Sequence, residues 1–449
     1  MSRLSVLDLR GDRSDPRDRL PRPAIDLAAA RQGVDASLRA VHERGDAALR
    51  ELTARFDGLE LAEDEPLAVP DQVLDAAVER IDDQLEAAFR RAIDDLRWFH
   101  ERARPQPWED VHGSARMGVW FNAIQRVGLY APGGKAPLPS SVLMAAVPAR
   151  IAGVEELVLC TPPTGVGPDG QRNGWPDVSI LAAARLCGVD RVVRVGGAQA
   201  IAALGYGTDS VPRCDKVVGP GNLYVSLAKQ QLVAEGRIGS DGYAGPTEVA
   251  IIADGTANPR VVASDLIGQC EHDELVVALL ITPDADLVHR VEQALEEELP
   301  ATRHRERIQT ALDGQGTVAL VDDIDHAVQV ADAFAAEHLE VQTAEPRKVA
   351  ERVRYAGTTF IGTPTPVTLG DYGAGPNHTL PTSGTARFAG GLTTSSFLVP
   401  VNYLECDDAA LRRLAPHIRP LTEAENLPAH WRPIETRFSD APPEGGDDA

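Results

Sequence analysis

After Val127 the chain alternates short apolar runs with alanine-rich stretches of helical spacing, and this alternation limits what the chain can fold into. Strands that alternate with helices form βαβ units, and such units build parallel sheets. The expected strands are residues 157–160, 191–195, 216–218, 249–253, 275–281, 317–321 and 358–361. The pattern therefore predicts an α/β protein whose strands form two parallel sheets.

The segment 71–100 precedes these units and has apolar residues at steps of three and four. That spacing places them on one face of an amphipathic helix. The face consists of Leu74, Val78, Ile81, Leu85, Phe89, Ile93 and Leu96. We expect one long helix here that supports the fold and carries no chemistry.

The 449 residues carry a formal net charge of −23, and this acidic excess narrows the classes of partner. An acidic surface repels nucleic acid and anionic membranes. The five scattered cysteines have no CxxC spacing, which argues against disulfides and against a thiolate zinc site. No apolar run is long enough to span a bilayer. We expect a globular cytoplasmic protein of two or three domains, with no nucleic-acid or membrane partner.

Three glycine-rich turns follow expected strands and precede expected helices. They are residues 130–135, 196–199 and 219–222. Backbone amides at the start of a helix can hold a phosphate, so Tyr130, Gln199 and Asn222 could lie beside a nucleotide. None of the turns has the GxxxxGK[ST] or GxGxxG spacing, and each by itself also fits a turn made for steric reasons. Parallel sheets bind ligands at the carboxyl ends of their strands, and we expect the functional loops there.

Gln269 and His272 are three residues apart near the end of the expected helix 261–272, so they share a face and could bind one ion. Such spacing is common, and a lone histidine near a helix end is more often solvated or packed in a core than a ligand. Two further candidates, Asp371 and His378, stand in a glycine-rich loop. Oxygen and imidazole ligands without thiolate suit catalytic zinc, or manganese.

Glu337 and His338 end the expected helix 324–336 and precede an expected strand. Neighbouring side chains on a helix point about 100° apart, so both can face one cleft only at a helix end. A carboxylate beside an imidazole could act as an acid/base pair. A solvated, charged helix end explains the dipeptide by itself at least as well.

The motifs occur in a fixed order along most of the chain. Two long segments stand out, GSDGYAGPTE at residues 239–248 and SDLIGQCEH at residues 264–272. The other matching segments are residues 128–141, 196–204, 219–222, 335–339, 370–382 and 424–430. In this order the motifs resemble the histidinol dehydrogenase family.

The resemblance implies a zinc enzyme that oxidises L-histidinol through the aldehyde to L-histidine, at the end of histidine biosynthesis, and reduces two NAD in turn. It implies His338 as the base for the hydroxyl proton and Glu337 as the group that activates water for the second oxidation. The implied zinc ligands are Gln269, His272, Asp371 and His430. The implied NAD contacts are Tyr130, Gln199 and Asn222. The implied substrate contacts are Thr247, Gln269, His272, His338, Asp371, Glu425 and His430.

The chain departs from the family at two places. Thr247 stands where many members have serine, and because the hydroxyl is kept we expect the substrate contact to survive. Residues 397–403 lack the basic residues associated with the family, which bears on subunit contacts rather than on chemistry. The alternatives are a relative that oxidises another polar alcohol and a non-catalytic metal- or nucleotide-binding protein. Retention of Glu337, His338 and His430 argues against both.

The resemblance also implies a domain plan. It has two Rossmann-like α/β domains, one inserted in the other, and a homodimer in which His430 reaches the partner's active site. The expected parts are an N-terminal arm (1–25), a first domain with the metal and catalytic residues (26–129 and 247–392), an NAD-binding domain (130–246), a C-terminal helical segment that crosses to the partner subunit (393–438) and a disordered acidic tail (439–449).

Overall fold

The computed structural model describes residues 4–23, 27–133, 136–167, 170–242 and 245–439. Some expected features lie outside these residues, namely Gly134 and Lys135 of the first glycine turn, Tyr243 and Ala244 of the long motif, and the tail from 441 to 449. The chain divides into two compact units, and each is described by itself. The first comprises residues 1–104 and 123–397, and the second residues 105–122 and 398–449.

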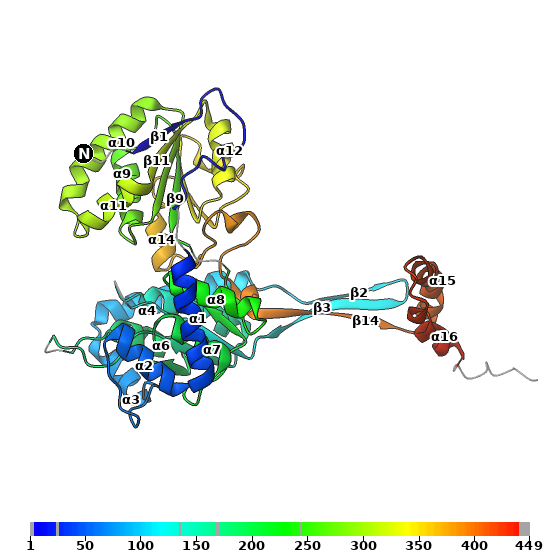
Figure 1. Ribbon diagram of the computed structural model, residues 1–449. Coiled ribbons are helices and arrows are strands. Elements are labelled where there is room, and N and C mark those ends of the chain that lie inside the picture. The colour runs from blue at the N-terminus through cyan, green and yellow to red at the C-terminus, as the bar shows by residue number, and fades with distance from the viewer. Residues whose placement is uncertain (1–3, 24–26, 134–135, 168–169, 243–244, 440–449) are drawn as a thin grey trace, which may run out of the picture. The chain divides into compact units, whose positions relative to one another are not determined.

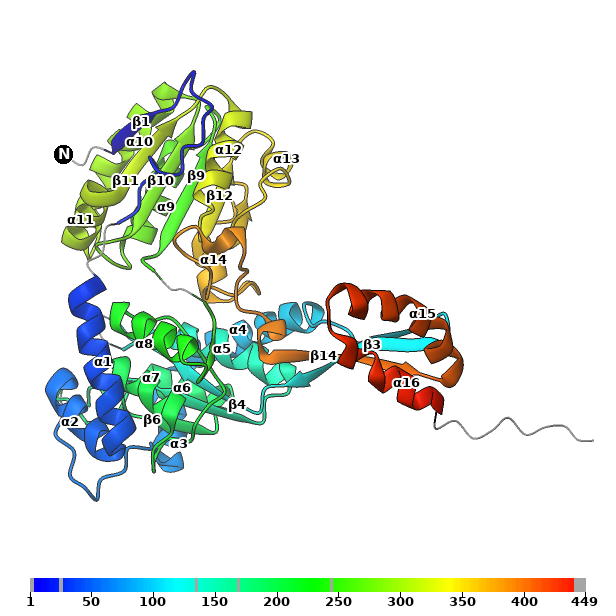
Figure 2. The same cartoon turned by 45° about the vertical axis from the view of Figure 1, so that its right-hand side comes forward.

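One parallel sheet of the first unit has six strands in the order β1-β11-β10-β9-β12-β13 (Figures 1 and 2). Its strands are β1 Ser5–Asp8, β9 Glu248–Ala253, β10 Val277–Thr282, β11 Gly316–Leu320, β12 His338–Gln342 and β13 Thr358–Ile361. The strand β1 belongs to the expected N-terminal arm, so that expectation is wrong for these residues. They are held in the sheet because Ser5 to Asp8 pair in parallel with β11.

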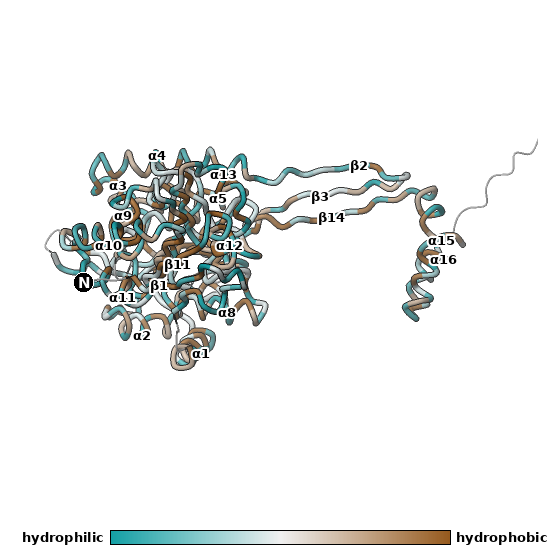
Figure 3. Tube along the Cα trace, turned by 90° about the horizontal axis from the view of Figure 1, so that it is seen from above, coloured by the Kyte–Doolittle hydropathy of each residue, from teal (hydrophilic) through white to brown (hydrophobic). Residues whose placement is uncertain are grey.

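Helices cover both faces of this sheet. Side chains alternate along each strand, so each strand presents apolar residues on both faces. On β9, Val249 and Ile251 face one apolar core, while Ala250 and Ile252 face another. The first core is closed by α9 Pro259–Cys270, α10 Ala285–Glu298 and α11 Arg305–Gln315, and the second by α12 Ile324–Phe334 and α13 Pro346–Ala350. Figure 1 shows α9, α10 and α11 on one side of the sheet and α12 on the other, and Figure 3 shows apolar residues gathered along strands such as β11. Burial on both faces explains the continuous apolar runs.

A second parallel sheet has five strands in the order β6-β5-β4-β7-β8. Its strands are β4 Arg126–Tyr130, β5 Glu156–Cys160, β6 Arg191–Val193, β7 Lys216–Val218 and β8 Gly239–Ser240. The helices around it are α1 Leu27–Arg44, α2 Asp46–Asp57, α5 Pro139–Ala152, α6 Val178–Leu186, α7 Gly197–Tyr206 and α8 Leu223–Ala234. The predicted α/β fold with two parallel sheets is confirmed.

The packing of the N-terminal helices differs from the expected domain plan. Val34 and Leu38 of α1 and Leu49 of α2 share one core with Tyr130 and Val158 of the five-stranded sheet. These helices therefore pack on the five-stranded sheet, whereas the expected plan grouped residues 26–129 with 247–392. The spacing of apolar residues gives a helix an apolar face, but it does not say which sheet buries that face.

The expected single helix over residues 71–100 is two helices, α3 Asp71–Arg80 and α4 Asp83–Arg102. The break lies at Ile81, whose ψ of 152° is extended, and Asp82 then caps α4 by accepting a hydrogen bond of 2.8 Å from the amide of Leu85. The apolar spacing continues through the break because both helices pack on the same layer, α3 on α6 and α4 on α5. An N-cap aspartate was the missed signal.

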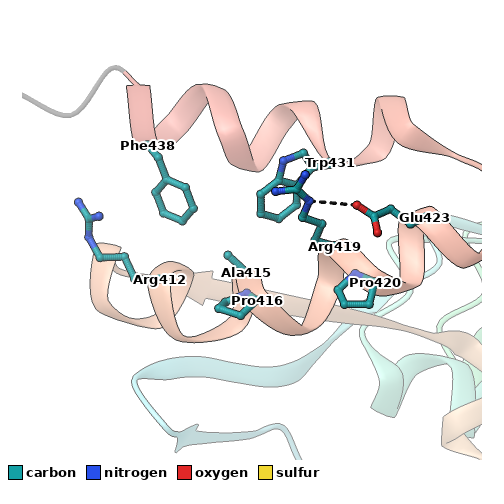
Figure 4. Close-up of a pocket in the computed structure, with 8 residues that line it drawn as sticks. All are labelled: Arg412, Ala415, Pro416, Arg419, Pro420, Glu423, Trp431 and Phe438. Atoms are coloured by element: carbon teal, nitrogen blue, oxygen red, sulfur yellow. Dashed lines mark hydrogen bonds and ion pairs between the residues drawn. The ribbon is translucent and has the colours of Figure 1, made fainter.

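The second unit is built on a three-stranded sheet in the order β14-β3-β2. Its elements are β2 Trp108–His112, β3 Ala115–Ala123, β14 Leu398–Cys406, α15 Asp408–Ala424 and α16 Arg432–Ser439. The expected C-terminal helical segment thus begins with a long strand. An open cavity of about 500 Å³ lies between α15 and α16. Arg419 lies over the Trp431 ring and donates to Glu423 over 3.0 Å, and these side chains are drawn in Figure 4. Among the described residues, no helix is long and apolar enough to cross a membrane.

Phe334 provides a test of the core under α12. Its side chain is fully buried, and the guanidinium of Arg22 lies 3.9 Å from the centre of its ring. We expect Phe334→Ala to lower the free energy of unfolding by about 3–5 kcal/mol, because it removes apolar contacts and leaves a cavity. Denaturant unfolding measures this change. Phe388→Ala is the matched control, since Phe388 is 82% exposed, and equal losses for both variants would contradict the packing.

Candidate active site

Most of the expected metal and catalytic residues gather at the amino ends of strands in the six-stranded sheet. Thr247 directly precedes β9, Glu337 directly precedes β12, and His338 is the first residue of β12. Because His338 pairs in register with Val249 on β9, Glu337 lies beside Glu248. We expected functional loops at the carboxyl ends. In this sheet the candidate residues lie at the opposite edge.

Glu337 is held in a chain of hydrogen bonds. Its Oε2 accepts from the backbone N–H of Glu248 over 2.9 Å and from the hydroxyl of Thr247. The same hydroxyl oxygen accepts from Nε2 of Gln269 over 2.7 Å. Burial raises the pKa of Glu337 well above its usual range, and the nearby charge of Asp371 raises it too, although the two hydrogen bonds oppose these effects. Such a carboxylate is a stronger base than an exposed glutamate.

His338 is buried, and its two ring nitrogens differ. Nδ1 lies 3.2 Å from the backbone oxygen of Glu248, which only accepts, so Nδ1 carries the hydrogen. Nε2 has no hydrogen-bond partner among the described residues and lies 3.8 Å from Oδ1 of Asp371. Burial lowers the pKa of His338 to about 3, below the near-neutral value expected of a base. The imidazole is therefore neutral at pH 7, with an open lone pair on Nε2.

Asp371 and His378 come from the glycine-rich segment, but Asp371 lies in a helix, α14 Val367–Tyr372, rather than in a loop. Burial raises the pKa of Asp371 to about 6. The Nδ1 of His378 donates to the backbone oxygen of Asp371 over 3.1 Å, and its Nε2 lies 3.5 Å from the hydroxyl of Ser141. Burial lowers the pKa of His378 to about 4.

His272 is not on the expected helix, because α9 ends at Cys270. The backbone N–H of His272 still donates to the backbone oxygen of Gln269 over 3.2 Å, and this bond extends the last turn of α9. Desolvation by nearby atoms lowers the pKa of His272. A positive charge on His272 or on His378 would lower the pKa of His338 further, because the three imidazoles lie close enough to interact electrostatically.

These residues suit a metal ion. The amide nitrogen of Gln269 is used in the bond to Thr247, which leaves its carbonyl oxygen as the donor atom. His272 is exposed within the chain, but nearby atoms still lower the pKa of its imidazole and favour the neutral form, which is the form that binds metals, and Asp371 supplies a carboxylate. Within the described residues, no three His, Cys, Asp or Glu side chains form a metal site by themselves. The candidate set instead combines amide, imidazole and carboxylate donors.

Glu425 and His430 belong to the second unit. Glu425 directly follows α15, and His430 ends the short 3-10 helix Pro428–His430. Both residues are exposed within the chain. The structure describes them only inside that unit.

The three expected NAD contacts lie at the carboxyl ends of strands in the five-stranded sheet. Tyr130 ends β4, and its hydroxyl accepts from the backbone N–H of Gly197 over 3.1 Å. Gln199 is 2% exposed, and its Nε2 has no partner in the part of the chain that the structure describes. Asn222 is exposed and caps α8 by accepting from the amides of Tyr224 and Val225. An unpaired buried amide beside helix N-termini fits a polar ligand such as a dinucleotide.

Glu248 is a residue that sequence reasoning missed. Its backbone N–H holds Glu337 and its backbone oxygen holds His338, while its buried side chain accepts from Arg22 and from the amide of Ser383 over 2.8 Å. A charged residue that opens an apolar strand was the available signal.

Comparison with known proteins points to one family. A family model described as histidinol dehydrogenase matches residues 20–438. The chain is 47% identical over 438 residues to the histidinol dehydrogenase of Thermobifida fusca, covering 97% of this chain and 98% of that protein. It is 45% identical over 449 residues to that of Streptomyces avermitilis, covering 98% and 99%. The crystal structure of histidinol dehydrogenase from Elizabethkingia anophelis superposes with a TM-score of 0.90 at 30% identity, covering 97% of this chain and 98% of that one.

Proposed function

The chain belongs to the histidinol dehydrogenase family and is an oxidoreductase that oxidises histidinol in histidine biosynthesis; from this premise we propose a mechanism in which zinc and NAD support two successive oxidations. The observation that carries the proposal is the neutral, buried imidazole of His338, whose Nε2 is open while Nδ1 is held by Glu248. That nitrogen can accept the hydroxyl proton of the substrate as hydride leaves its carbon.

We propose that Gln269, His272 and Asp371 hold zinc, and that His430 of a second copy of the chain completes the set. The substrate would contact Thr247, His338 and Glu425. It would also contact the four proposed zinc ligands. When bound, zinc fixes the imidazole and amine of histidinol in place, and NAD accepts the hydrides. Tyr130, Gln199 and Asn222 would contact NAD.

Each catalytic residue then has one task. The imidazole of His338 takes the alcohol proton at Nε2; burial makes this nitrogen a weak base, and the carboxylate of the proposed zinc ligand Asp371, 3.8 Å away, stabilises the imidazolium that forms. Glu337 accepts a proton from the water that adds to the aldehyde, because its carboxylate is buried and of raised pKa. The Thr247 hydroxyl and the Glu248 amide keep that carboxylate oriented.

We also propose the finer domain plan. Residues 27–104 and 123–242 form an α/β domain that binds NAD and is inserted in a second domain made of β1 and the residues from 245 to 392. Residues 398–439 reach the partner subunit of a homodimer. A cytoplasmic location follows from the five free cysteines, because a reducing compartment keeps thiols unpaired.

The yield of NADH tests the proposed function. Purified protein with zinc, NAD and L-histidinol is expected to form two NADH for each histidinol consumed, because the alcohol and then the hydrated aldehyde each lose a hydride. The measurement is NADH absorbance against histidinol consumed. One NADH would mean that the aldehyde is the product. None with histidinol, but turnover with other polar alcohols, would show a relative with another substrate.

Replacing Asp371 tests the metal site. Asp371→Asn keeps the shape of the side chain but removes the negative charge, so we expect zinc affinity to fall by about 100-fold or more. Competition with a chelating dye measures the dissociation constant. Asp94→Asn is the control, since the Asp94 side chain is 70% exposed. An unchanged zinc dissociation constant in Asp371→Asn would remove Asp371 from the ligand set.

A further inference from the structure

A lysine is completely buried under the expected NAD contacts. Lys229 of α8 is 1% exposed, and its Nζ lies 2.6 Å from Oδ1 of Asp241, whose side chain is 4% exposed. Lysine is almost never buried this deeply unless it is paired. Taking both charges out of water costs more than an apolar pair of the same size would, so stability alone does not account for the pair.

The pair holds one residue, Gly219, by both of its polar backbone groups. The Nζ of Lys229 donates to the backbone oxygen of Gly219 over 3.0 Å. The Oδ2 of Asp241 accepts from the backbone N–H of the same glycine over 2.7 Å. The hydroxyl of Ser240 donates to Oδ1 of Asp241 over 2.9 Å and steadies it. Gly219 therefore has both its polar backbone groups bound to the buried charges.

Gly219 needs this support because of its conformation. Its φ is +119°, and a Cβ there would lie 2.1 Å from the backbone oxygen of Tyr130. The glycine directly follows β7 and begins the turn that ends at Asn222, the N-cap of α8. The backbone groups of Gly219 thus set the path of the chain between the end of β4, where Tyr130 lies, and the side chain of Asn222.

We propose that Lys229 and Asp241 are positioning residues for the dinucleotide: they hold the backbone N–H and C=O of Gly219 and so orient the dinucleotide without touching it. This inference rests on the proposed NAD site. It predicts that loss of the pair weakens NAD binding and leaves histidinol binding nearly unchanged. NAD binding and histidinol binding should respond differently because the pair acts on the turn at β7, whereas the expected substrate contacts lie on other elements.

The test uses the full-length zinc-loaded protein and two variants. Lys229→Met leaves Asp241 buried without its partner, so it can disturb folding. Lys229→Met/Asp241→Leu removes both charges, which is the change that folded proteins tolerate best. In both variants we expect the KM for NAD and the dissociation constant of NADH to rise about tenfold or more, with the KM for histidinol within about twofold of the unmodified protein. A merely structural role would lower the active fraction, and hence kcat, without moving the KM for NAD.

Two further variants keep the result decisive. Ser240→Ala removes only the hydroxyl on Asp241, and we expect a rise of about two- to fivefold in the dissociation constant of NADH. Lys348→Met is the control, since Lys348 pairs with Glu345 on the surface with 74% of its side chain exposed. Unchanged NADH binding in the Ser240 variant and in a folded double variant would overturn the inference while the NAD site stands. Failure of the unmodified protein to bind NADH would overturn the proposed function itself.

Discussion

Asn in place of His338 is expected to lower kcat for histidinol oxidation by about 10³- to 10⁴-fold, the upper range for loss of a general base. The amide of Asn can still donate to the backbone oxygen of Glu248, as Nδ1 of His338 does, so the fold is kept. It has no basic nitrogen to replace Nε2. The measurement is the steady-state rate of NADH formation at saturating histidinol and NAD.

Zinc content distinguishes a lost base from a lost site. His338 is not among the proposed ligands, so His338→Asn should retain zinc. His304→Asn is the matched control, because the His304 side chain is 41% exposed and lies outside the site. If kcat of the zinc-loaded His338 variant stays within about tenfold of the unmodified protein, another group is the base.

Glu337→Gln is expected to slow the oxidation of the aldehyde by about 10²- to 10³-fold, and the alcohol step much less. The amide oxygen of Gln can still accept from Thr247 and from Glu248, so the hydrogen-bond chain survives. The negative charge that accepts a proton from water is lost. The yield of NADH per histidinol should fall from two toward one.

The aldehyde itself is the second readout for this variant. A carbonyl trapping reagent should capture histidinaldehyde from the Glu337 variant and little from the unmodified protein. Glu345→Gln serves as the control, since the Glu345 side chain is 63% exposed. If the Glu337 variant forms two NADH at the normal rate, water is activated by another group and the assignment of Glu337 is wrong.

The two sheets use opposite edges. In the five-stranded sheet, the turns after β6 and β7 follow the usual rule for parallel sheets and lie at carboxyl ends. In the six-stranded sheet, Thr247 and Glu337 stand before their strands, so backbone groups of β9 hold the proposed catalytic pair. The general rule predicts a site at the first of these edges and not at the second.

Local patterns in the sequence predicted most strands of the two parallel sheets, the apolar face of residues 71–100 and the order of motifs that marks the family. These follow from local periodicity and from residue identity, which need no knowledge of the partner in space. The sequence also supplied the pair Glu337 and His338, but it left their dipeptide equally open to a solvated helix end.

The contacts around that pair depend on the tertiary structure. Glu248 and Glu337 are 89 positions apart, and they meet because β9 and β12 pair in one register. The apolar face of α1 could have covered either sheet, and the tertiary structure places it on the five-stranded one. The proposed role of Lys229 likewise depends on its tertiary contacts with Gly219 and Asp241. Contacts of this kind depend on which strands become neighbours, and no local pattern carries that information.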